Sequence, residues 1–97
     1  MFLGIDIGTS SAKAVLTDVD GGVAAVASRP CSVSRPHPLW SEQEPEDWVA
    51  AAVAAVDELA ARLPDAVGAV GGIGFSGQMH GAVLLGQDGR VLRPAIL

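Results

Sequence analysis

A carboxylate, a glycine and three hydroxyls follow one another near the N-terminus. Residues 6–11 read DIGTSS, directly after an apolar stretch, and Lys13 follows two residues later. Glycine lets a phosphate approach the backbone, while consecutive N–H groups and hydroxyls can donate to its oxygens. A carboxylate beside them can hold Mg²⁺, usually through water. The pattern predicts a phosphate-binding turn. Its candidate ligands are Gly8, Thr9, Ser10, Ser11 and Lys13 for the phosphate and Asp6 for the metal.

The same residues also fit an ordinary hairpin turn, in which Asp and Thr side chains bond to their own backbone. They do not form a Walker A loop, because G-x-x-x-x-G-K-[ST] is absent and a strand is predicted next rather than a helix. Lys13, the only lysine of the chain, could face a phosphate or could be solvated. Residue types and spacing leave both alternatives open.

A second polar group follows a glycine-rich strand pattern, where residues 76–81 read SGQMHG. Polar side chains at strand ends are where open α/β sheets bind ligands. Gln78 and His80 could hydrogen-bond to sugar hydroxyls, and Met79 could close over an apolar carbon face. The alternative is a turn with an exposed glutamine and a locally bonded histidine.

Two further motifs are formal matches only. Residues 72–77 fit G-x-G-x-x-G, but they lie within a predicted strand and no helix pattern follows them. Ser76 resembles the serine of a nucleophile elbow, but Gln78 stands where the second glycine is required. Cys31 is expected to be a core or edge thiol, and His37 to be part of a loop.

The elements that must position these residues follow from apolar pattern and turn chemistry. Strands are expected over residues 2–7, 12–18 and 23–28 as an antiparallel meander, the first buried on both faces. Pro45 opens a helix that Pro64 ends, with a face of Trp48, Val49, Ala52, Val53, Val56, Leu59 and Leu63. A strand over 69–76 and a hairpin of 83–85 with 90–92 complete an α/β fold with a mixed sheet.

The loop over residues 32–44 is expected to be ordered by burial of Leu39 and Trp40. The chain then ends in the apolar residues 94–97. An apolar end on so apolar a chain predicts a piece of a larger protein, with surface that packs on parts beyond Leu97.

Composition limits the class of protein. Ninety-seven residues make one domain at most, and 49% hydrophobic with 18% charged residues exclude intrinsic disorder. A net charge of −5 argues against partners such as nucleic acid or an anionic membrane. One cysteine gives no internal disulfide, and neither a signal peptide nor a membrane-spanning run of about 18–20 apolar residues is found. A soluble cytoplasmic protein is expected.

Three segments together resemble the FGGY carbohydrate kinases. They are residues 4–10, the loop 34–45 (SRPHPLWSEQEP) and residues 77–81 (GQMHG), and residues 93–97 extend the likeness. Within that family the chain is most similar to members that phosphorylate D-xylulose. The resemblance implies part of an actin-like, ribonuclease H-like ATPase domain that transfers the γ-phosphoryl group of ATP to this ketose. Members that phosphorylate glycerol carry an Arg-Glu pair in place of Met79 and His80.

By the same resemblance, Asp6 acts on the Mg²⁺ and phosphate side and is not the catalytic base. The phosphate turn is formed by Gly8, Thr9, Ser10 and Ser11, with Lys13 nearby, while Met79 and His80 contact the ketose. Family members are several times longer, and their second domain, adenine pocket and base lie beyond Leu97. Residues 1–97 alone are therefore expected to be inactive.

Two other functions stay open at this stage. One is an FGGY kinase for another pentulose or a polyol, and the other is a non-catalytic actin-like module that binds nucleotide. A second copy of the full-length protein, forming a homodimer, is among its expected partners, and the sequence leaves the oligomeric state open.

Overall fold

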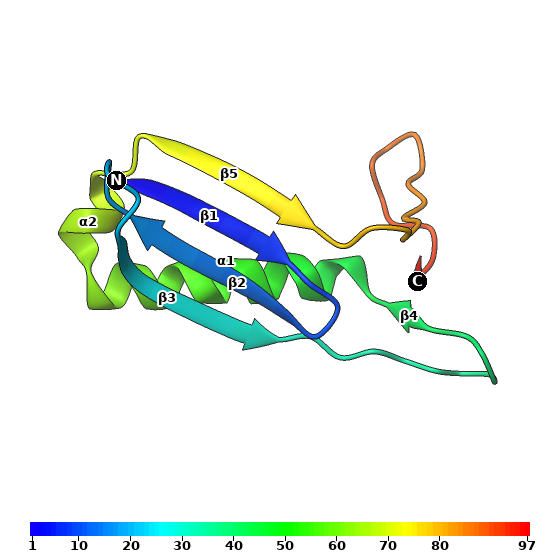
Figure 1. Cartoon of the computed structure of the whole chain (residues 1–97). Helices are drawn as coiled ribbons and strands as arrows, with labels where there is room; N and C mark the ends of the chain where they lie inside the picture. The colour runs from blue at the N-terminus through cyan, green and yellow to red at the C-terminus, as the bar shows by residue number, and fades with distance from the viewer.

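The first three strands form an antiparallel meander, as predicted. In the computed structural model, which describes residues 1–97, these are β1 (Phe2–Ile7), β2 (Ser11–Thr17) and β3 (Val23–Pro30). β5 (Gly72–Gly77) adds parallel to β1 and gives the order β3-β2-β1-β5. The mixed sheet is therefore confirmed, and the carboxyl ends of β1 and β5 lie at the same edge (Figure 1).

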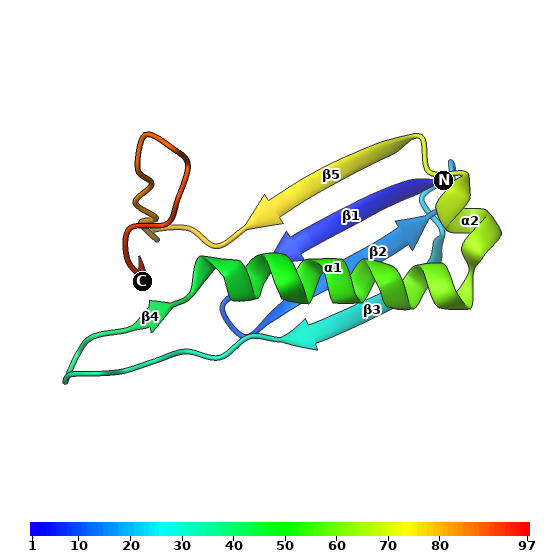
Figure 2. The same ribbon diagram turned by 180° about the vertical axis from the view of Figure 1, so that it is seen from behind.

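Helix α1 (Pro45–Arg62) begins at the proline that the sequence singles out and covers one face of the sheet (Figure 2). Of the predicted face, Leu59 is buried and Val56 packs partly buried against the core, but the other buried residues include Ala51 and Ala55, which were not predicted. Val49 and Val53 are 59% and 54% exposed. The reason is that small side chains line both surfaces, so the helix lies close over β2 and β3. The buried alanines of these two strands are Ala12, Ala14, Ala25 and Ala27.

The prediction that residues 2–7 are buried on both faces is wrong. Leu3 is buried under the helix side, whereas Phe2 is 49% exposed and Asp6 is exposed on the opposite side. The single covering helix lies on one face, and nothing within residues 1–97 packs on the other. The face that carries Asp6 is therefore open.

The chain returns from α1 through a second, shorter helix. α1 ends at Arg62, as expected from Pro64, but that proline then opens α2 (Pro64–Gly68). Because the amide groups of Ala69 and Val70 still bond back to α2, the next strand begins at Gly72 rather than at residue 69. None of the helices in the chain combines the length and apolarity needed to cross a membrane.

The segment between β3 and α1 is held differently from the prediction. Leu39 is 105% exposed and Trp40 is 50% exposed, so neither anchors the loop. The anchor is instead a short antiparallel pair between β4 (Glu42–Gln43) and β6 (Ala95–Ile96). The apolar end of the chain supplies this partner strand.

The predicted hairpin over residues 83–92 is reduced to one bridge, between Leu85 and Val91. Its turn forms as expected, with Gly89 at a φ of 80° and the Asp88 carboxylate accepting from the Arg90 amide. The two flanking segments are too short and too exposed to pair further.

Candidate functional site

Both predicted polar groups lie at the carboxyl edge of β1 and β5. The turn of residues 8–10 joins β1 to β2, and the loop that follows β5 starts beside it (Figure 1). The amide of Gln78 donates to the Ile7 carbonyl at 3.0 Å, which extends the strand pairing beyond β5. The parallel pairing thus brings together two segments that are about seventy residues apart.

Asp6 has a direct partner on the neighbouring strand. The two parallel strands place Asp6 opposite Ser76, and the Ser76 hydroxyl donates to Asp6 Oδ1 at 2.5 Å. Hydrogen bonds from a hydroxyl to a carboxylate are short and strong, so this contact orients the carboxylate. The same open face carries a hollow of about 350 Å³, lined in part by Gly4, Gly74 and Asp6.

The turn after β1 has the features of an anion site. The Gly8 amide donates to the Ser11 carbonyl at 2.9 Å, and a Cβ at Gly8 would lie only 3.1 Å from that oxygen. The amides of Thr9 and Ser10 donate to no acceptor in the chain, and neither serine hydroxyl has a partner. Free N–H groups in sequence attract anions.

Lys13 is exposed on β2, opposite Asp6 in the strand register. The three ion pairs of the chain join other residues, so the ammonium of Lys13 has no carboxylate partner within 4.0 Å. Its charge is therefore available on the open face, beside the hollow next to Asp6.

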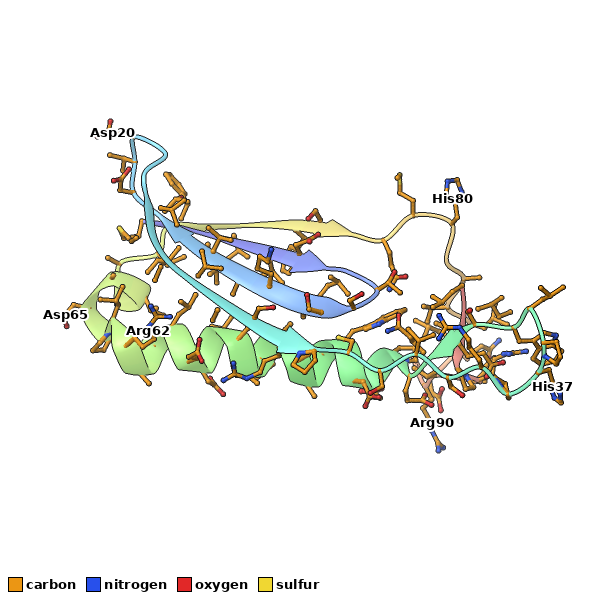
Figure 3. The ribbon with its side chains drawn as sticks, turned by 60° about the horizontal axis from the view of Figure 1, so that its bottom comes forward. Asp20, His37, Arg62, Asp65, His80 and Arg90 are labelled. Carbon is orange, nitrogen blue, oxygen red and sulfur yellow. The ribbon has the colours of Figure 1, made fainter.

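Gln78 lies against the turn, whereas the two residues that follow it, Met79 and His80, are exposed. The Thr9 hydroxyl donates to Gln78 Oε1 at 3.2 Å. Met79 is 81% exposed, and His80 is exposed with a φ of 63°. Figure 3 shows the His80 ring on the loop after β5, pointing away from the ribbon, with Asp20 at the far end of the sheet.

The sequence reasoning missed two side chains at this edge. The sequence predicts no role for Ser76 beyond its place in the polar group of residues 76–81, yet its hydroxyl is bonded to Asp6. Its signal was a polar residue in register with Asp6 on the adjacent strand. Gln43 is part of the loop motif 34–45, yet it is 2% exposed and its side chain contacts both Thr9 and Gln78. No pattern in the sequence marks it as buried.

The remaining polar candidates lie outside this group. Cys31 is half-buried just after β3, as expected for an edge thiol, and its amide donates to Ser10. His37 packs edge-on against Trp40, with ring centroids 4.7 Å apart, in the exposed loop. The G-x-G-x-x-G match falls within β5, as the sequence predicts.

The donor set fits Mg²⁺ bound in the way nucleotide enzymes bind it. The chain has no group of three or more His, Cys, Asp or Glu side chains that could form a protein-only metal site. Mg²⁺ beside nucleotides is held by one or two carboxylates together with waters and phosphate oxygens. Asp6, next to a turn with free N–H groups, has the chemistry for that arrangement.

Comparison with known proteins gives a consistent result. The model of the N-terminal domain of the FGGY family of carbohydrate kinases matches residues 1–97. The xylulose kinase of Klebsiella pneumoniae is 52% identical over 97 residues, which cover 100% of this chain and 20% of the relative. The chain therefore spans about a fifth of the length of the first curated relatives it matches.

Solved structures agree in fold. The crystal structure of a xyloylose (xylulose) kinase from Brucella ovis superposes with a TM-score of 0.97 at 50% identity, over 99% of this chain and 20% of that one. The xylulose kinase from Rhodospirillum rubrum gives a TM-score of 0.92 at 42% identity, over 98% and 20%.

Proposed function

The chain belongs to the FGGY family of carbohydrate kinases, and from that premise we propose that residues 1–97 are the N-terminal part of the first domain of an ATP-dependent xylulose kinase. The reaction would transfer the γ-phosphoryl group of ATP to a hydroxyl of D-xylulose and give D-xylulose 5-phosphate. The support for this sugar is the likeness to relatives named as xylulose kinases, at up to 52% identity. Because ATP is the phosphate donor, we assign the enzyme to the cytoplasm.

On the phosphate side, we assign the turn of residues 8–11 to the terminal phosphate of ATP. The free amides of Thr9 and Ser10 and the hydroxyls of Ser10 and Ser11 would donate to its oxygens. Lys13 would add positive charge from β2. Mg²⁺, when bound with Asp6 on this side, would neutralise charge that develops during transfer.

On the sugar side, we assign Gln78, Met79 and His80 to the ketose. Met79 and His80 are exposed at the same sheet edge as the turn, so they are accessible to a second ligand. Asp6 is bonded to Ser76, and we assign it to the phosphate side. General base catalysis requires hydrogen-bond reach to the attacking hydroxyl, so we assign the base to a residue outside this chain.

The observation that carries the proposal is the contact between the two groups. Thr9 of the turn and Gln78 of the corner after β5 are hydrogen-bonded to each other at 3.2 Å. Phosphoryl transfer depends mainly on holding the donor and acceptor in line and on neutralising charge. A phosphate site and a sugar site that share a border would bring the donor and the acceptor close together, which supports the first of these requirements.

The test is an assay of the full-length protein with ATP and a panel of acceptors, including D-xylulose, other pentuloses and glycerol. Formation of ADP and of the phosphosugar should be fastest with D-xylulose, and glycerol should be a poor acceptor. A preference for another acceptor would replace the sugar assignment. Nucleotide binding with no turnover on any acceptor would overturn the proposal in favour of a non-catalytic nucleotide-binding module.

A further inference from the structure

Gln43 is the one buried polar side chain of the core, and its amide makes four hydrogen bonds. Nε2 donates to the carbonyls of Thr9 at 2.7 Å and Ser32 at 3.2 Å. Oε1 accepts from Trp48 Nε1 and from Gln78 Nε2, both at 3.1 Å. A glutamine amide has two donor hydrogens and two acceptor lone pairs. All of its hydrogen-bonding capacity is therefore used within the chain.

The neighbours of this amide permit one orientation only. The indole N–H of Trp48 can only donate, so Oε1 of Gln43 must face it. The carbonyls of Thr9 and Ser32 can only accept, so Nε2 must face them. A flipped amide would place donor against donor and acceptor against acceptor.

This orientation determines the next two groups in turn. Because Oε1 of Gln43 accepts, the Gln78 atom facing it must be its NH₂ group. The other end of Gln78 is then its oxygen, which accepts from the Thr9 hydroxyl. The hydroxyl hydrogen of Thr9 is thus committed to Gln78. Phosphate donors at the turn are therefore the backbone amides and the hydroxyls of Ser10 and Ser11.

The backbone of Gln43 is itself held from both sides. Gln43 pairs with Ala95, which is fully buried, and α1 starts two residues later at Pro45. On the alternate face of the same short strand, Glu42 forms an ion pair with Arg93. The backbone that carries the Gln43 side chain is therefore held in place by strand pairing rather than lying in an unpaired loop.

We propose that Gln43 is a positioning residue, which locks the phosphate turn and the corner after β5 in a single relative arrangement. This inference rests on the proposed kinase function. Gln43 touches neither proposed ligand, so its effect would pass through Thr9 and Gln78. A misplacement on the order of 1 Å between reacting groups can cost about 100-fold in rate.

The first test is Gln43→Met in the full-length enzyme, which keeps the length of the side chain but removes all four hydrogen bonds. We expect kcat to fall by about 10- to 100-fold, while the Kd values of ATP and of the ketose, each measured alone, change by less than about threefold. The matched control is Gln87→Met, in an exposed turn, which should keep kcat. An unchanged kcat in folded Gln43→Met, or losses confined to Kd, would overturn the inference.

The second test is Gln43→Glu, whose activity should depend on pH. Protonated, the new carboxyl can donate to the Thr9 carbonyl and accept from Trp48. Ionised, it places negative charge against two carbonyl oxygens. Burial raises the pKa of such a carboxyl, so kcat relative to the unchanged enzyme should be partly rescued near pH 5.5 and fall toward about pH 8. If the ratio of the two kcat values does not change with pH, the inference is overturned. This test remains available if Gln43→Met does not fold.

A crystal structure of the Gln43→Met enzyme separates this inference from the proposed function. If the unchanged enzyme phosphorylates no sugar, the proposed function fails. The positioning role is then decided by whether the Gln78 side chain leaves Thr9 in the variant. A Gln78 that keeps its bond to Thr9 without Gln43 would refute the role, whatever the substrate.

Discussion

Asp6 lies on β1, two residues before the turn that carries the free amides of Thr9 and Ser10, and its carboxylate is bonded to Ser76. We predict that Asp6→Asn in the full-length enzyme lowers kcat by at least about 100-fold, because the side chain keeps its size and its acceptor for Ser76 but loses the charge that would hold Mg²⁺. Ketose binding, measured by calorimetry without nucleotide, should change little. Steady-state kinetics at saturating ATP and Mg²⁺ give kcat.

The matched control for this charge removal is Asp88→Asn. Asp88 accepts from the Arg90 amide in an exposed turn, a contact that asparagine keeps. Its kcat should stay within about twofold, as for most surface substitutions. Equal losses in both variants would point to a general charge effect. A drop in ketose affinity as large as the drop in kcat at Asp6 would place it on the sugar side instead.

His80 stands at a φ of 63°, in the left-handed region where side chains other than glycine are uncommon. Its ring is directed to solvent at the sheet edge. We predict that His80→Ala raises the KM for the ketose by about 10-fold or more, with a smaller effect on kcat, because it removes contacts made in the ground state as well as the transition state. The KM for ATP should not change.

A second substitution at the same position separates the ring from the backbone. His80→Gly suits a positive φ at least as well as histidine does. If the imidazole binds the sugar, the glycine and alanine variants should show the same rise in KM. Recovery of the normal KM by glycine would show that the backbone conformation, and not the ring, is what the ketose requires.

At the scale of elements, Leu59 is the largest fully buried side chain through which α1 packs on the sheet. Leu59 is fully buried in a cluster with Leu3, Leu16 and Ala55. We predict that Leu59→Ala lowers the free energy of unfolding of this domain by about 2–5 kcal/mol, through lost burial and the cavity that remains. Leu39→Ala, at a fully exposed position, should change it by less than about 0.5 kcal/mol. Denaturant unfolding followed by circular dichroism measures both, and equal losses would contradict this core.

The sheet could be predicted from local sequence because its signals are local. The turn at residues 18–22 sets the β2–β3 connection, with the Asp18 carboxylate accepting from the amides of Asp20 and Gly22. The family match confirms the predicted actin-like α/β fold. The burial of Ala51 and Ala55 in place of Val49 and Val53 could not be predicted, because valine outranks alanine in hydrophobicity. The distance between the helix and the sheet decides which residues are buried, and alanines packed on alanines allow the helix to come closest to the sheet.

The candidate site was predictable where its chemistry lies within one short run. The spacing of residues 6–11 fits a phosphate turn as well as an ordinary hairpin turn, and the structure gives that turn two free amides. Ser76 and Gln43 act through contacts made 70 and 34 residues away in sequence. Such contacts depend on strand register and on the β4–β6 pair.

At the scale of the whole molecule, α1 lies over β2 and β3 and leaves β5 uncovered on the same face of the sheet (Figure 2). An apolar groove of about 500 Å³ lies there, with Ile5, Val49, Val53 and Phe75 among its lining residues. Exposed apolar surface of this kind binds hydrophobic dyes. We predict that residues 1–97, expressed alone, bind 8-anilinonaphthalene-1-sulfonate strongly, as measured by its fluorescence.

A paired substitution tests whether the groove is the source of that binding. Val53→Ser should weaken the dye signal of the 97-residue chain, because it removes an apolar wall of the groove. Val19→Ser, at a position 76% exposed outside the groove, is the matched control and should leave the signal unchanged. Equal reductions would show that the dye binds elsewhere or reports on unfolding.

Phosphoryl transfer needs a donor and an acceptor held in line, charge neutralisation on the phosphate, and a base within reach of the hydroxyl. Residues 1–97 supply the proposed phosphate turn, Asp6 and the proposed sugar corner, all at one edge of an open sheet face. The chain offers no second wall to close over either ligand.

We predict that the purified 97-residue chain shows no xylulose-dependent release of ADP above background, even at millimolar ATP, Mg²⁺ and ketose. A coupled assay with the full-length enzyme as positive control measures this. Ketose-dependent turnover by the short chain would mean that the base lies among these residues and that the role given to Asp6 must be revised.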